Sequence, residues 1–203
     1  MTLRLWLLGD GERDAAMLPP ILEQALGEPV EVANERPAER SWHGLTLAGG
    51  GYARKLAFAA RQALDARADG LVAVVDQDRA EPRARLRELE RGREQARARV
   101  ATPVAIGEAR PHGEAWLLDD AVAVRLALEL PPAAAIPTVR DGQAKPALDE
   151  LIDASPRAGE RPVDLLAEIA RALDPGRCAH AKETGLADFV DDVRRELSPR
   201  RPR

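Results

Sequence analysis

The feature that most constrains the fold of this chain is a repeated alternation of short apolar runs with longer segments of helical periodicity. The clearest run, Leu71 to Val75, follows Gly70 and contains only apolar residues, which is typical of a strand buried on both faces. Three similar runs occur elsewhere, and apolar residues recur at helical spacing in the segments that follow them. The expected strands are residues 3–8, 29–32, 71–75 and 103–106, and the expected helices are residues 12–26, 52–67, 81–99 and 114–130.

This order predicts an α/β protein with a parallel, Rossmann-like sheet that is covered by helices on both faces, because parallel strands need crossover connections. Residues 1–130 are expected to form this core. Residues 131–197 are predicted to be a helical extension packed on the same domain, and residues 198–203 a mobile basic tail. The extension contains three short helical pieces, at residues 147–152, 162–173 and 186–197.

The composition narrows the class of protein. With 203 residues, 45% of them hydrophobic, the chain is long enough to bury one sizeable core. Its net charge of -4 argues against a protein that coats nucleic acid by charge alone. The lone Cys178 cannot form an internal disulfide, and the apolar run at residues 5–8 is too short for a membrane span or a signal peptide. These features favour a cytoplasmic protein without a membrane partner.

Acidic residues follow three of the four expected strands. Asp10 comes after the first strand, Asp76 and Asp78 come after the third, and Glu114 follows the fourth. Asp14 lies one helical turn beyond Asp10 and is expected to face the same crevice. Because ligands of parallel α/β sheets bind outside the carboxyl ends of the strands, we expect these carboxyl groups to converge.

Converging carboxylates repel one another unless a cation neutralises them, and Mg²⁺ or Mn²⁺ prefers such oxygen ligands. One or two bound ions would allow phosphodiester cleavage without a reactive His or Cys. The alternative for each residue alone is structural: Asp10 or Asp78 would cap the following helix, and Asp14 would favour the positive end of its helix dipole.

The same segments carry a resemblance to a known family. Residues 8–14 (LGDGERD), 74–79 (VVDQDR) and 113–119 (GEAWLLD) are similar to motifs of small stand-alone TOPRIM-like proteins, and the pair at residues 145–146 resembles the family more faintly. This family is related to the TOPRIM domains of overcoming-lysogenization-defect nucleases, topoisomerases and primases. Its small members are often encoded beside an ATPase in bacterial defence or mobile-element loci.

The resemblance implies a TOPRIM-type core and a metal-dependent nuclease that acts on DNA or RNA, as the effector subunit of such a system with a separately encoded ATPase. It implies that Asp10, Asp76, Asp78 and Glu114 are metal ligands, that the cofactor is Mg²⁺ or Mn²⁺, and that these residues together with Asp14 and Lys145 are catalytic. Whether the chain also forms a homo-oligomer stays open.

Basic residues near the strand ends are candidates for contacts with nucleic acid. Arg54 and Lys55 begin the helix after the glycine run at residues 49–51, whose N–H groups are suited to a phosphate, although a flexible turn is an equal alternative. Arg79 follows the second carboxylate pair, and His112 precedes Glu114. A mainly exposed, self-solvating surface is the competing interpretation for such charges.

Two other functions remain open from the residues. In the resembled family the first acidic residue is usually Glu, and here it is Asp10, one methylene shorter. This departure favours a catalytically silent TOPRIM-like subunit that binds a partner. A receiver-like phosphoacceptor domain ranks lower, because the two aspartates at 76 and 78 and the segment at Glu114 do not fit its pattern.

Overall fold

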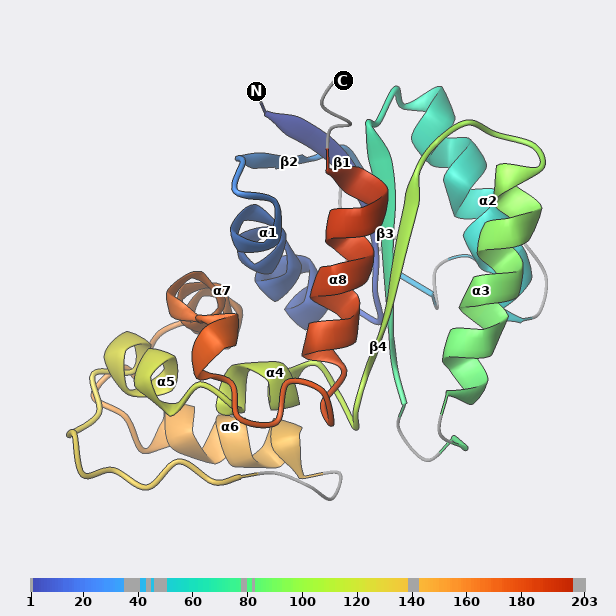
Figure 1. The fold of residues 1–203 in the computed structure, drawn as a ribbon. Helices are drawn as coiled ribbons and strands as arrows, with labels where there is room; N and C mark the ends of the chain where they lie inside the picture. Colours follow the sequence, from blue (N-terminus) through green and yellow to red (C-terminus); the bar gives the residue numbers. More distant parts are fainter. Residues whose placement is uncertain are drawn as a thin grey trace.

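The computed structural model describes residues 2–34, 41–42, 45, 51–77, 80–81, 83–138 and 143–198. It confirms the expected α/β class, with a parallel sheet between two layers of helices (Figure 1). The strands are β1 (Leu3–Leu8), β2 (Val30–Val32), β3 (Gly70–Asp76) and β4 (Val104–Ala109). The helices are α1 (Glu12–Leu26), α2 (Tyr52–Asp65), α3 (Ala84–Arg97), α4 (Glu114–Leu118), α5 (Ala121–Ala127), α6 (Ala144–Asp153), α7 (Pro162–Ala172), the short 3₁₀ turn η2 (Pro175–Arg177) and α8 (Leu186–Leu197).

The strand order fixes where a ligand site can form. The described strands lie in the order β2-β1-β3-β4 and every pair is parallel, with Leu7 opposite Val72 and Asp76 opposite Ala109. The chain passes from β1 to β2 on one side and then to β3 on the other side of β1, so the direction of winding reverses between β1 and β3. Such a reversal opens a crevice beyond the carboxyl ends of the two strands.

Each face of the sheet has its own apolar layer. Side chains of β3 alternate between the faces: Val72 and Val74 belong to the layer under α1 and α8, and Leu71, Ala73 and Val75 belong to the layer under α2 and α3 (Figure 1). These five side chains are at most 1% exposed. The sequence run is therefore apolar throughout because the strand is buried from both sides.

The C-terminal helices lie on the same face of the sheet as α1 (Figure 1). Helix α8 lies against β4 and α1, α7 packs on α1, and α6 lies beside α4 (Figure 1). Phe189 of α8 stacks on Trp116 of α4, with 5.1 Å between the ring centroids. Residues of α7 and α8 thus share one hydrophobic core with β1 and β3.

The expected continuous helix over residues 114–130 is wrong. The chain leaves the helical path at Asp119 and Asp120 and forms two short helices, α4 and α5. The Asp120 carboxylate caps α5 by accepting the N–H groups of Val122 and Ala123, each at 3.1 Å. The same buried carboxylate also accepts hydrogen bonds from Nε and Nη2 of Arg177, which fixes the break through a contact far away in sequence.

Among the described residues, no helix is long and apolar enough to span a bilayer.

Candidate functional site

Asp10 and Asp76 meet at the reversal between β1 and β3. Asp10 lies two residues beyond the end of β1, and Asp76 is the last residue of β3. The backbone N–H of Asp76 donates to Oδ2 of Asp10 at 3.3 Å, so the two strand ends are joined directly. The crevice expected from the strand order therefore has a carboxyl group on each side.

Asp14, in the first turn of α1, lies beside Asp10 in this crevice. Its side chain is buried, and its Oδ2 accepts the N–H of Asp10 at 2.6 Å. Gly9 permits this approach: a Cβ added there would lie 2.6 Å from Cβ of Asp14 and 2.7 Å from its Oδ2. A glycine at position 9 is thus required for Asp14 to reach the strand end.

Glu114 belongs to the same cluster and lies in the segment that follows β4. It is the first residue of α4 and only 5% exposed. Gly113, just before it, donates its N–H to Oδ1 of Asp76 at 3.0 Å, and an added Cβ at Gly113 would collide with the Met17 side chain. The turn after β4 is therefore packed closely against α1 and the end of β3.

Arg13 supplies the positive charge in this crevice. Its Nη1 donates to Oε1 of Glu114 at 2.9 Å, and its Nη2 donates to Asp149 of α6. One guanidinium group thus links α1, α4 and α6. Sequence reasoning assigned no role to Arg13 or Asp149; a signal in the sequence was the position of Arg13 next to Asp14, on the turn that faces Asp10.

Burial and neighbouring negative charge raise the pKa of two of the carboxyl groups. Burial raises the pKa of Asp76 to about 9, and the neighbouring charges of Asp14, Asp10 and Glu114 add to this increase. Burial likewise raises the pKa of Asp14 to about 7, with Asp10 and Glu114 contributing. Without a cation, Asp76 is therefore protonated at neutral pH, because low solvation and nearby negative charge both disfavour its ionised form.

The remaining predicted residues have different positions. Lys145 is exposed in the first turn of α6, and within the described part of the chain it makes no ion pair with the cluster. Arg54 is exposed on α2, whereas the ammonium group of Lys55 donates to the carbonyl of Trp42. His112 is partly buried in the turn before Glu114. Asp78, Arg79 and the glycines at 49 and 50 lie outside the described residues.

The donor set suits a hard divalent cation, but it is not gathered around one point. Among the described residues, no group of three or more His, Cys, Asp or Glu side chains stands in an arrangement that could hold a metal ion. Asp76 uses Oδ1 for Gly113 and Glu114 uses Oε1 for Arg13, which leaves each carboxylate a second oxygen. The chemistry of the oxygen donors fits Mg²⁺ or Mn²⁺, and binding would require their side chains to turn inward.

The fold and the site define a class: an α/β protein with a parallel sheet and a buried carboxyl cluster at the reversal of strand order. The chain matches no protein-family model, no curated protein and no solved structure.

Proposed function

We propose that this protein is a Mg²⁺- or Mn²⁺-dependent nuclease of TOPRIM type that cleaves phosphodiester bonds of DNA or RNA. The observation that carries the proposal is the convergence of Asp10, Asp14, Asp76 and Glu114 at one strand-order reversal. Burial, with the nearby carboxyl groups, raises the pKa of Asp14 and of Asp76, so ionising these two groups costs stability, and a cation that pairs with them would offset that cost.

Within this proposal, some carboxyl groups bind the cation and another positions a ligand. Asp10, Asp76 and Glu114 would hold the cation, together with Asp78. When bound, the cation supplies Lewis-acid stabilisation of the phosphodiester oxygens and a more acidic water. Asp14 positions Asp10 through the hydrogen bond from the Asp10 N–H, and Arg13 pairs with Glu114.

Arg13 could also neutralise the negative charge of a substrate phosphate. Its guanidinium lies between Glu114 and Asp149, so once a cation pairs with Glu114 the guanidinium can turn toward a phosphate, which it fits in a bidentate geometry. Lys145 would assist from the adjacent α6.

The proposed role includes a partner. With a net charge of -4, the isolated chain should bind nucleic acid poorly, and an ATPase subunit from the same defence or mobile-element system would supply most of the positive surface. Asp10 would then be the ligand whose shorter reach lowers the rate of the isolated chain.

The test is cleavage of duplex DNA, single-stranded DNA and structured RNA by the purified chain with Mn²⁺, Mg²⁺ or chelator, alone and with the product of the adjacent gene. Asp76→Asn should abolish metal-dependent cleavage, whereas Asp65→Asn, at an exposed carboxylate of α2, should not. Cleavage that survives Asp76→Asn would refute the assignment.

A silent TOPRIM-like subunit is the second candidate, and one observation favours it: the described carboxylates are not gathered for metal binding and Arg13 already pairs with Glu114. Metal binding without cleavage under any of these conditions would select this alternative.

A further inference from the structure

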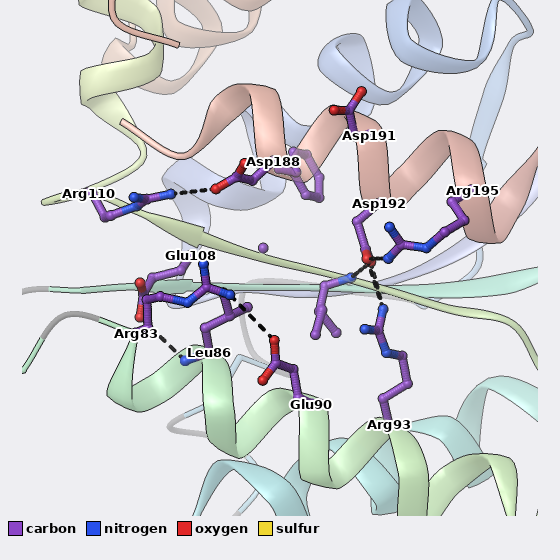
Figure 2. Close-up of a pocket in the computed structure, with 13 residues that line it drawn as sticks. Arg83, Leu86, Glu90, Arg93, Glu108, Arg110, Asp188, Asp191, Asp192 and Arg195 are labelled. Carbon is purple, nitrogen blue, oxygen red and sulfur yellow. Dashed lines mark hydrogen bonds and ion pairs between the residues drawn. The ribbon is translucent and has the colours of Figure 1, made fainter. Parts of the chain in front are cut away.

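A second pocket lies at the outer edge of the sheet, between α3, β4 and α8 (Figure 2). Its volume is about 330 Å³, enough for a small organic molecule. Among the described residues, five acidic side chains and four arginines line it, and it shares none of them with the carboxyl cluster at β1 and β3.

Most charges on the α8 side of this pocket are paired. The Asp192 carboxylate accepts hydrogen bonds from Arg93, at 2.8 Å, and from Arg195. Arg110 donates to Asp188 at 2.9 Å. Figure 2 shows Arg93 of α3 reaching Asp192 of α8, and Arg110, just after β4, reaching Asp188 of α8. The arginines are thus already neutralised and do not make the pocket attractive to anions.

Glu108 is the exception. It is 3% exposed, and its Oε1 accepts the N–H of Leu86 at 3.3 Å. Its Oε2 is buried, lacks a hydrogen-bond partner among the residues that the structure describes, and belongs to a side chain that lines the pocket. A buried carboxylate oxygen without a donor is costly, so a group that donates to it would bind favourably.

Helix capping accounts for Oε1 of Glu108 but not for Oε2. Leu86 is in the first turn of α3, where an N–H group has no partner within the helix, and Oε1 of Glu108 satisfies it. The positive end of the helix also favours a negative charge there. A glutamine could accept the same N–H, so capping does not account for the second, unpaired oxygen.

The other unpaired polar atom of the pocket does not compete as a site. Nε of Arg110 also lacks a partner among the described residues, but the same guanidinium already donates from Nη2 to Asp188 at 2.9 Å. Its positive charge is therefore already balanced by a carboxylate.

We propose that this pocket binds a small organic cation with a primary ammonium group, which donates to Oε2 of Glu108. The acidic residues outnumber the arginines, which favours a positive ligand. Only one oxygen of Glu108 is available, which matches the compact donor of an ammonium group better than the two-pronged fork of a guanidinium.

Arg83 is the lining arginine that a cationic ligand can displace most easily. It lies just before α3, and its side chain is 54% exposed. Its only described ion pair is a long one, 3.6 Å to Glu90. A ligand ammonium can therefore enter the pocket without breaking a buried ion pair of Arg83.

The Leu86 amide is a direct reporter, because it donates to the same carboxylate. The full chain labelled with ¹⁵N would be titrated with n-propylamine at neutral pH, in chelator. We expect a saturable shift of the Leu86 amide signal. Glu108→Gln, which can still cap α3, should weaken binding by about tenfold or more, as expected for a lost hydrogen bond to a charged group.

Two controls define the outcome. Tetramethylammonium has the same charge but no N–H donor and should leave Leu86 unshifted. Arg83→Ala removes a competing cation at an exposed position and should tighten propylamine binding, which keeps the test valid if Glu108→Gln fails to fold. Equal shifts with tetramethylammonium, equal binding by Glu108→Gln, or a Leu86 shift produced only by Mg²⁺ would overturn the proposal.

Discussion

Asp76 shows at the scale of a residue how the site combines position with electrostatics. The end of β3 places its carboxyl group against Gly113 and Asp10, where burial and three neighbouring carboxyl groups raise its pKa to about 9. Asp14 behaves similarly, with a pKa raised to about 7. Without a bound cation, both shifts make the site sensitive to pH.

In chelator, these two groups should make the protein less stable as pH rises. Their folded-state pKa values lie above the ordinary value of 3.8, so the folded state holds the protons more tightly. Their stabilising contribution is complete below about pH 4 and is lost as pH rises through about 7 and about 9. Urea unfolding of Asp76→Asn between these limits should show a flatter profile than the native protein. An Asp76→Asn profile parallel to the native one would contradict the raised pKa.

Arg13 should matter for stability because Glu114 depends on it. Replacing Arg13 with Met leaves the buried Glu114 carboxylate without its charged donor, which we expect to cost about 2 kcal/mol in the free energy of unfolding. In the Glu114→Gln background the same change should cost clearly less. Arg54→Met, on the exposed face of α2, is the matched control. Equal costs in both backgrounds would show that the pair does not interact.

At the scale of elements, two glycines set how closely α1 and α4 approach the strand ends. Gly9 sits against Asp14, and Gly113 sits against Met17. The break between α4 and α5 also depends on a close contact, because Asp120 follows the end of α4 at Asp119, caps α5 and binds Arg177. The contacts of Gly113 and Asp120 involve neighbours that are distant in sequence.

Gly9→Ala should therefore disturb the site far more than Gly11→Ala. The added methyl group at Gly9 would overlap Asp14 and force α1 away from β1, at a cost of about 1–3 kcal/mol. At Gly11 an added Cβ would meet no described atom within 4 Å. Thermal unfolding of both variants gives the comparison. A Gly9→Ala protein as stable as Gly11→Ala would mean that the close packing at Asp14 does not exist.

At the scale of the whole molecule, the sequence predicted the layers and most of the carboxyl cluster. Continuous apolar runs encoded the strands, and parallel strand ends necessarily bring Asp10, Asp76 and Glu114 to one edge. The sequence did not predict the Arg13–Asp149 contact, which joins residues 136 positions apart. The helix break at Asp120 was missed for the same reason, since its partner Arg177 approaches only in the folded chain.

A cation that binds the folded cluster should stabilise the whole molecule. A ligand at a hundredfold excess over its Kd adds about 2.7 kcal/mol to the free energy of unfolding. Mg²⁺ or Mn²⁺ should therefore raise the Tm of the native protein and of Asp65→Asn, and have little effect on Asp76→Asn. Identical midpoints with metal and with chelator would refute metal binding at this site.

The central claim, that the carboxyl groups at the strand-order reversal form a metal site, is tested most directly by an anomalous difference map from crystals grown with Mn²⁺. The account predicts a Mn²⁺ peak bounded by Asp10, Asp76 and Glu114, with Arg13 displaced from Glu114. A well-ordered crystal with no peak there, with the Arg13–Glu114 pair intact at saturating Mn²⁺, would contradict it.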